Sequence, residues 1–156
     1  MSTGLASLEQ PQPAPAVVAR RHTVLIIDDD DTLSDVLCHR LKKQGLQAVA
    51  AYSGLAGLAK AKAEPPSAIV LDLGLPDADG LSICQQLADA PETCSVPILI
   101  LSGTDEPGIV RRCRAAGCHY FLRKPYDPNA LLVLIHQAMR EAGNWDADGP
   151  DGGEGR

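Results

Sequence analysis

Five short apolar runs alternate with segments of helical spacing along the chain, and this alternation limits the possible folds more than any other feature. Each run is four to six residues long, a length that suits a strand, and the runs span residues 24–27, 46–51, 68–71, 98–101 and 119–122. Strands that alternate with helices are typical of βα units built around a parallel sheet. The sequence therefore predicts an α/β fold with a five-stranded parallel sheet and five helices.

The segments between these runs carry helix start and stop signals. The first helix is expected from residue 32 to 44, with Gly45 as its C-terminal cap, and its apolar face is formed by Leu33, Val36, Leu37 and Leu41. Ser53 can cap a second helix, whose apolar residues are Leu55, Leu58 and Ala59. Pro107 and Pro128 each stand where the first turn of a helix tolerates proline, so they mark the fourth and fifth helices.

Composition indicates one small domain with a segment of different character at each end. The chain has 156 residues, 45% of them hydrophobic but only 3% aromatic, so we expect a single core that is aliphatic. Residues 1–21 are rich in proline and alanine and are predicted to form a disordered arm. Residues 143–156 are acidic and rich in glycine and are predicted to form a disordered tail. The folded domain is therefore expected to span residues 22–142.

The charge and the cysteines exclude several classes of protein. A net charge of -6 argues against non-specific nucleic-acid binding, so partners are expected to be proteins. No apolar run approaches the roughly 18 residues needed to span a bilayer, and we expect a cytoplasmic protein. The five cysteines are odd in number and lack C-x-x-C spacing, which indicates reduced thiols; they are Cys38, Cys84, Cys94, Cys113 and Cys118.

Polar residues follow four of the expected strands at the point where each strand ends. They are Asp28 and Asp29 after the first strand, then Asp72, Ser102 and Lys124. Ligands of an open parallel sheet bind outside the carboxyl ends of its strands, so these side chains are expected to converge on one pocket. The set points to an aspartate that accepts a phosphoryl group.

Metal-assisted phosphoryl transfer needs a hard cation with oxygen ligands, a nucleophile and donors for the phosphoryl oxygens. Asp29 and Asp72 are expected to bind Mg²⁺ directly, together with a backbone carbonyl near Gly74, whereas Asp28 acts mainly through water. Once Asp72 carries the phosphoryl group, Lys124 can pair with its oxygens, and the Ser102 hydroxyl can hydrogen-bond to them.

At these positions the chain resembles the receiver domains of two-component response regulators, to which single-domain chemotaxis regulators belong. The resemblance covers about residues 22–141 and rests on the residues named above, on the segment 69–80 around Asp72, on Ser102-Gly103 and on Lys124-Pro125. It implies a bacterial stand-alone response regulator with a doubly wound, flavodoxin-like sheet of strand order 2-1-3-4-5.

The resemblance also implies a mechanism. Asp72 would take a phosphoryl group from the phosphohistidine of a sensor kinase or of a histidine phosphotransfer protein, and the Lys124-Pro125 peptide bond would be cis. Ser102 would then move toward the phosphoryl group. An aromatic residue three positions before the lysine would turn inward, and here that residue is Phe121, where tyrosine is more usual.

The same resemblance implies the partners. A downstream protein target would bind the face formed by residues 106–141, and the protein would be a monomer or a phosphorylation-dependent dimer. Neither a DNA-binding domain nor a membrane segment is expected. The protein would act as a switch, promoting only its own phosphorylation and slow dephosphorylation.

Two alternatives stay open from the sequence. The run Asp28-Asp29-Asp30-Asp31-Thr32 also fits the start of a haloacid-dehalogenase-type phosphohydrolase with Asp28 as the nucleophile, although the final acidic pair of that family has no candidate after Lys124. The other alternative is a receiver-like scaffold that is not phosphorylated. Such a scaffold would normally lack at least one site residue, and none is missing here.

Overall fold

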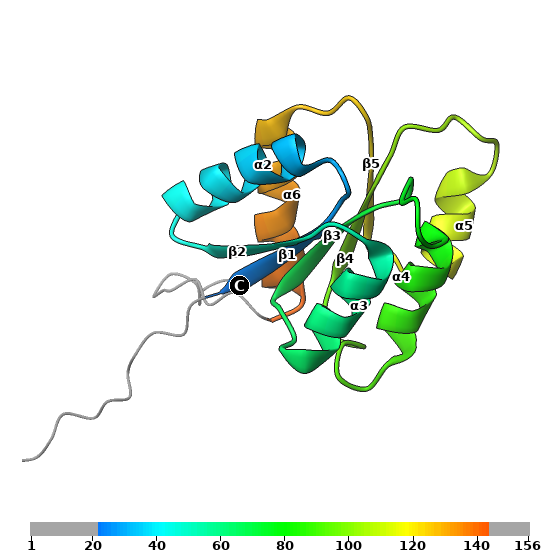
Figure 1. Ribbon diagram of the computed structural model, residues 1–156, viewed down its shortest axis with the longest axis horizontal. Coiled ribbons are helices and arrows are strands. Elements are labelled where there is room, and N and C mark those ends of the chain that lie inside the picture. Colours follow the sequence, from blue (N-terminus) through cyan, green and yellow to red (C-terminus); the bar gives the residue numbers. More distant parts are fainter. Residues whose placement is uncertain (1–21, 144–156) are drawn as a thin grey trace, which may run out of the picture.

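A computed structural model describes residues 22–143 of the chain (Figure 1). The strands are β1 (Thr23–Ile27), β2 (Gln47–Ala51), β3 (Ala68–Asp72), β4 (Ile98–Ser102) and β5 (Tyr120–Arg123). The helices are α2 (Asp31–Lys43), α3 (Gly54–Ala63), α4 (Gly80–Asp89), α5 (Ile109–Ala115) and α6 (Pro128–Glu141). The arm and nearly all of the tail expected from the sequence lie outside the described residues.

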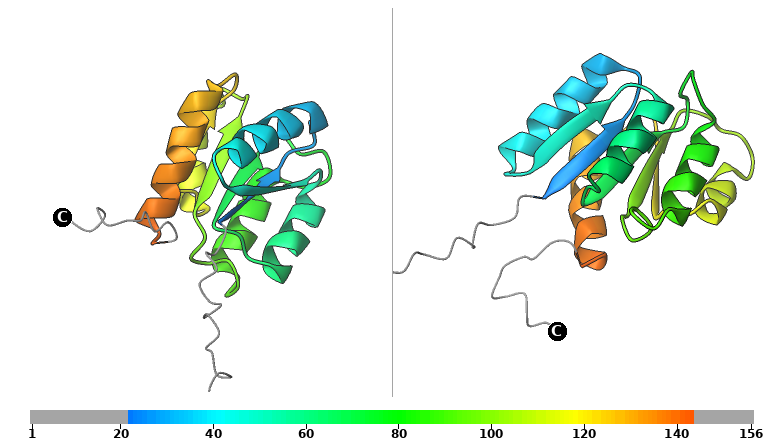
Figure 2. Two further views of the ribbon diagram at one scale, coloured as in Figure 1. Left: turned by 90° about the vertical axis from the view of Figure 1, so that its left-hand side faces the viewer. Right: turned by 60° about the horizontal axis from the view of Figure 1, so that its bottom comes forward.

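All five strands are parallel and lie in the order β2-β1-β3-β4-β5, which confirms the predicted fold class and strand order. Helices α2 and α6 cover one face of the sheet, and α3, α4 and α5 cover the other, as Figure 1 and Figure 2 show. Strands β3 and β4 are buried along their whole length, as expected for the centre of a doubly wound sheet.

Alternate residues of β1 pack on opposite faces of the sheet. Val24 and Ile26 belong to the core cluster under α2 and α6, whereas Leu25 and Ile27 belong to the cluster under the other three helices. Both clusters consist almost entirely of aliphatic side chains, with cysteine and methionine at a few positions, so the prediction of an aliphatic core is confirmed.

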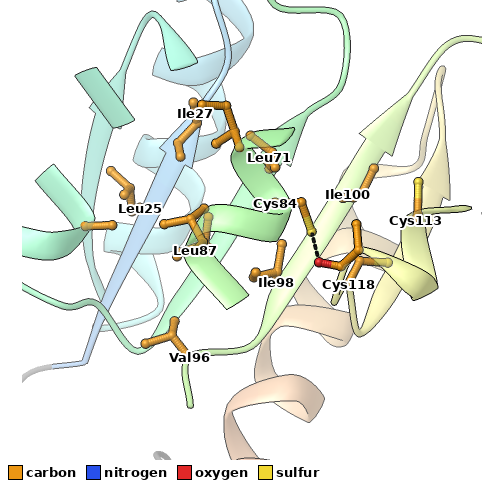
Figure 3. Packing of buried hydrophobic residues seen from close by; sticks show 14 of the residues in the cluster. Leu25, Ile27, Leu71, Cys84, Leu87, Val96, Ile98, Ile100, Cys113 and Cys118 are labelled. Atoms are coloured by element: carbon orange, nitrogen blue, oxygen red, sulfur yellow. Dashed lines mark hydrogen bonds between the residues drawn. The ribbon is translucent and has the colours of Figure 1, made fainter. Parts of the chain in front are cut away.

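Three cysteines lie within the core under α3, α4 and α5 (Figure 3). The Cys84 thiol donates a hydrogen bond of 3.5 Å to the carbonyl of Ala116. Burial raises the pKa of Cys84 to about 12 and the pKa of Cys118 to about 11, so both thiols stay protonated at neutral pH. All five cysteines are free, which agrees with the expected reduced thiols.

Short polar side chains cap four of the helices. Asp30, Ser53, Asp79 and Asp127 accept hydrogen bonds from backbone amides in the first turns of α2, α3, α4 and α6 respectively. Pro128 lies in the first turn of α6, as predicted. The prediction for Pro107 was wrong, because Pro107 precedes the helix. Gly108 adopts a left-handed φ of 79°, which is not a helical conformation, so α5 begins only at Ile109.

Two expected helix faces were also partly wrong. Val36 of α2 is exposed, although Leu37 and Leu41 are buried. On α3, the side facing the sheet carries Gly54, Gly57 and Ala61, and Leu55 points outward. The cause is close packing, since a Cβ at position 57 would lie 2.5 Å from the Cδ1 atom of Ile27. Among residues 22–143, no helix is long and apolar enough to cross a membrane.

Candidate functional site

The sheet brings the predicted residues together at its carboxyl edge. Asp72 and Ser102 are the last residues of β3 and β4, and Asp28 and Lys124 directly follow β1 and β5. Backbone hydrogen bonds extend the ladder past the strand ends: the Asp28 amide donates to the carbonyl of Ala51 at 3.0 Å, and the Lys124 amide donates to that of Ser102 at 2.8 Å. The backbone at these positions is therefore fixed by the sheet itself.

Lys124 is the cation of this group. Its Nζ atom lies 3.2 Å from Oδ1 of Asp72 and 3.6 Å from Oδ2 of Asp28. Both carboxylates are nearly inaccessible, at 5% exposed for Asp72 and 3% for Asp28. Burial alone would lower the pKa of Lys124, but the two carboxylates outweigh burial and raise the pKa, so the ammonium stays charged.

Asp28, Asp29 and Asp72 form a compact acidic cluster. One carboxylate oxygen from each lies within 4.8 Å of the others. Burial raises the pKa of Asp28, and the charges of Asp72 and Asp29 add to that effect, while the amide of Asp30, which donates to Asp28 at 3.0 Å, opposes it. Neighbouring carboxylates repel one another, and a divalent cation with oxygen ligands relieves that repulsion. The residues present therefore fit Mg²⁺.

Ser102 lies beside the acidic cluster at the end of the neighbouring strand. It is buried, and its hydroxyl oxygen accepts a hydrogen bond of 3.1 Å from the amide of Thr104. Two glycines leave space around the acceptor side chain. A Cβ at Gly74 would meet only Oδ2 of Asp72, at 3.9 Å, and a Cβ at Gly103 would meet only the Cβ of Lys124, at 4.0 Å. At these two positions the loops therefore place no side chain against Asp72.

A cavity of about 420 Å³ lies on the side of the sheet that α4 and α5 cover. It is lined by residues of the β3–α4 loop, the β4–α5 loop and the two helices that follow them, namely Leu73, Gly74, Asp79, Leu81, Ser102, Gly103, Thr104, Glu106, Ile109 and Arg112. On the other side of the sheet, a groove of about 380 Å³ lies between α2 and the β5–α6 loop, where Val36 and Tyr126 form part of its wall.

Phe121 and Pro125 are the remaining residues predicted for the site. Phe121 lies in β5, opposite Ile100 of β4, and is half-buried against the core under α3, α4 and α5. The Lys124-Pro125 peptide bond is cis, the isomer that the resemblance implies. All the predicted side chains are therefore near the same edge of the sheet except Phe121, which lies two residues before Arg123, the partner of Ser102 in the sheet.

Sequence reasoning missed three residues near the site. Tyr126 lies close enough to Asp28 for the carboxylate to add to the effect of burial, which raises the pKa of this tyrosine. Asp77 accepts hydrogen bonds from the amides of Gly54, at 2.8 Å, and Leu55, at 3.1 Å, and so joins the β3–α4 loop to α3. Arg112 falls within the face of residues 106–141 expected to bind a target, and its pairing with Glu106 was not predicted. The contacts of Tyr126 and Asp77 cross long stretches of sequence and leave no local pattern.

Comparisons with known proteins agree on one family. Residues 24–136 match the family model described as response regulator receiver domain. The DNA-binding dual master transcriptional regulator RpaA of Synechocystis sp. is 32% identical over 117 residues, which cover 75% of this chain and 48% of the relative. The chain spans about half the length of the curated relatives it matches.

Solved structures show the same fold. The chemotaxis response regulator CheY4 of Vibrio cholerae is 25% identical, with a TM-score of 0.71, and the match covers 76% of this chain and 99% of that one. A CheY-like response regulator receiver domain protein of Methanospirillum hungatei JF-1 is 23% identical, with a TM-score of 0.75 over 80% of this chain and 98% of that one. These matches favour a receiver over both alternatives left open by the sequence.

Proposed function

The chain belongs to the response regulator receiver domain family, a family of phosphoryl-accepting signalling switches, and on that premise we propose that Asp72 is its phosphoryl acceptor. The observation that supports this assignment is the position of the Asp72 carboxylate. It is buried at a strand end, paired with Lys124 at 3.2 Å and grouped with two further carboxylates, and the neighbouring loop position Gly74 has no side chain to cover it.

In the proposed reaction, a carboxylate oxygen of Asp72 attacks the phosphorus of a donor in line with the leaving group. Asp28, Asp29 and Asp72 would hold Mg²⁺, joined by the carbonyl of Gly74, with Asp28 acting mainly through water. When bound, the cation neutralises negative charge on the phosphoryl oxygens. Lys124 already lies beside Asp72 and pairs with the phosphoryl group after transfer, because an ammonium prefers the more highly charged partner.

Signalling would depend on how the phosphoryl group on Asp72 moves the residues around it. In the unphosphorylated protein the Ser102 hydroxyl accepts from the Thr104 amide. The same hydroxyl can donate to a phosphoryl oxygen, and if Ser102 moves toward that oxygen, the β4–α5 loop would move with it through the bond from Thr104. Phe121, half-buried beside that strand, would then turn inward and change the surface formed by residues 106–141. That surface is where we place a downstream target or a phosphorylation-dependent dimer contact.

The donor in this proposal is the phosphohistidine of a sensor kinase or of a phosphotransfer protein, in the cytoplasm of a bacterium. The stand-alone arrangement and the pathway remain predictions.

Intact mass spectrometry after incubation with Mg²⁺ and phosphoramidate tests the assignment. We expect wild type to gain one phosphoryl group when Mg²⁺ is present, and we expect no adduct when Mg²⁺ is left out or when Asp72→Asn is used. Asp77→Asn, which changes an exposed carboxylate in the same loop, serves as the matched control and should still be labelled. Labelling of Asp72→Asn, or phosphatase turnover that depends on Asp28, would contradict the proposal.

A further inference from the structure

Four exposed arginines gather where α5 lies beside the end of β5; they are Arg111, Arg112 and Arg114 of α5 and Arg123, the last residue of β5. Two carboxylates lie among them, and Asp105 pairs with Arg123 while Glu106 pairs with Arg112. Arg111 and Arg114 form no ion pair with any residue in the range 22–143. This surface therefore keeps two unpaired positive charges, although the whole chain has a net charge of -6.

Three of these arginines, Arg111, Arg114 and Arg123, line one hollow of about 610 Å³, which we call the arginine hollow; the two paired carboxylates also line it. Arg111 and Arg114 are three residues apart on a helix, so they lie on the same face about 5–6 Å apart. Arg123 and Asp105 are 52% and 83% exposed, so another carboxylate can replace Asp105 at little cost. Because a guanidinium binds a carboxylate through two parallel hydrogen bonds, the hollow suits a segment of chain with several carboxylates.

A second group of cations ends α2 and consists of Arg40, Lys42 and Lys43. All three lie in the last turn of the helix, where the helix dipole favours positive charge. Their position is therefore explained within α2 itself. Arg111, in contrast, lies outside the last turn of α5, and Arg123 lies on a strand, so the charge of the arginine hollow has no such local explanation.

The chain itself contains an acidic segment that begins near this surface. Residues 144–156 carry one basic residue, Arg156, and four carboxylates, those of Asp146, Asp148, Asp151 and Glu154. Helix α6, which precedes the segment, ends beside β5, because the Tyr120 hydroxyl donates to Oε1 of Glu141 at 2.6 Å.

The distance from the end of α6 to the arginine hollow is short compared with the length of the segment. Strand β5 is an edge strand, with α6 on one face of the sheet and α5 on the other (Figure 1). From Tyr120 to Arg123 the strand covers only about 10 Å. Residues 144–156 can extend over about 40 Å, so carboxylates from Asp148 onward are within reach of the hollow.

We propose that the acidic segment of residues 144–156 binds the arginine hollow of its own chain, with its carboxylates facing Arg111, Arg114 and Arg123. Because the segment is tethered, its effective concentration at the hollow is high, and weak ion pairs are enough to hold it. The hollow lies in the face of residues 106–141, where we place a downstream target. The bound segment would compete with that target; this consequence rests on the proposed function, whereas the contact itself does not involve Asp72.

Trp145 reports on this contact, since it is the single tryptophan of the chain and directly precedes Asp146. Acrylamide quenching of its fluorescence would be measured in the full chain at low salt and in about 0.5 M NaCl, which screens exposed ion pairs. We expect salt to raise the quenching constant of wild type. Arg111→Gln combined with Arg114→Gln should show the raised constant already at low salt, because losing two exposed ion pairs lowers the ratio of bound to free segment about fivefold.

A matched control removes two cations of the same spacing elsewhere. Arg40→Gln combined with Lys43→Gln changes exposed residues of α2 and should keep the low quenching constant of wild type. An equal constant at low salt for wild type and the α5 variant would overturn the proposal, as would release of the segment by the α2 variant. Protection of Trp145 that grows with protein concentration would also overturn it, because the segment would then bind a second copy of the chain.

Exchange of the charges tests the pairing directly. Arg111→Asp combined with Arg114→Asp should free the segment, and the further changes Asp148→Arg and Asp151→Arg should restore protection that salt removes. Failure of this rescue would mean that the segment does not lie against α5. All these measurements use the unphosphorylated protein without Mg²⁺, so they stand even if Asp72 is never labelled, and their failure leaves Asp72 as the proposed acceptor.

Discussion

Two regions meet at Asp72, and they are built differently. The strand-end group consists of Asp28, Asp72, Ser102 and Lys124, whose backbones belong to the sheet ladder or directly extend it, and whose side chains are mostly buried. The loop group lies on the cavity side and consists of Gly74, Gly103, Thr104, Glu106 and Arg112, most of which are exposed. The first group contains the side chains expected to carry the chemistry, and the second forms the exposed loops next to them.

The two groups differ in how tightly their residues are held. The strand-end group has little freedom, because four strands fix it and an ion pair of 3.2 Å ties Lys124 to Asp72. Loops tolerate substitution without loss of the fold, so residues of the second group can change while the strand-end group stays intact. Variants that treat the two regions separately can therefore test whether they differ in this way.

The largest expected effect on stability separates two glycines of the β3–α4 segment. A Cβ at Gly80 would lie 2.7 Å from the Cα of Leu73 and 2.8 Å from its carbonyl oxygen, whereas a Cβ at Gly74 has its nearest contact at 3.9 Å. Gly80→Ala should therefore lose about 2 kcal/mol of unfolding free energy in urea denaturation. Gly74→Ala should stay within about 0.5 kcal/mol of wild type. Equal losses would show that the loop beside Asp72 is as tightly packed as the start of α4.

A smaller effect is expected within the strand-end group. Asp28→Asn removes one of three clustered carboxylates but keeps an oxygen for the Asp30 amide. Without metal, we expect the variant to be more stable than wild type by about 1 kcal/mol, because like charges repel. It should also bind Mg²⁺ more weakly in calorimetric titration.

Asp35→Asn, an exposed change on α2 outside the cluster, is the control for this experiment and should alter neither quantity. A loss of stability in metal-free Asp28→Asn would mean that the ion pair with Lys124 outweighs the repulsion within the cluster.

The strand-end group was predictable because its signals are local. Each reactive residue stands at the end of an apolar run, and the parallel order of the strands then brings those ends to one edge. Caps such as Ser53 were predictable for the same reason, since the hydrogen bond spans only three residues. Helix orientation was harder, as the outward-facing Leu55 shows, because it depends on how closely α3 approaches Ile27.

The loop group was not predictable in its arrangement. Arg112 is an ordinary basic residue of a helix until the β4–α5 loop places Glu106 beside it. The start of α5 was misplaced because the left-handed turn at Gly108 is not marked by any periodic pattern. Contacts of this kind depend on the packing of whole elements, so spacing along the chain does not reveal them.

The smallest expected effect concerns Asp77, which joins the loop beside Asp72 to a helix 23 residues earlier. Hydrogen bonds from the amides of Gly54 and Leu55 lower the pKa of this carboxyl below its ordinary value. Its stabilising effect is therefore present above the ordinary pKa of an aspartate and is lost as the pH falls through the lowered pKa. Asp77→Ala should be less stable than wild type at neutral pH, and the difference should shrink in acid.

Asp77→Asn distinguishes the charge from the hydrogen bonds, because asparagine also accepts from backbone amides at a helix start. We expect its stability to lie between those of wild type and Asp77→Ala at neutral pH, when all three are compared by urea denaturation. A difference between wild type and Asp77→Ala that persists unchanged in acid would mean that the contact is not electrostatic. If instead Asp77→Ala keeps full stability but alters the labelling rate of Asp72, the link to α3 serves to position the loop rather than to stabilise the fold.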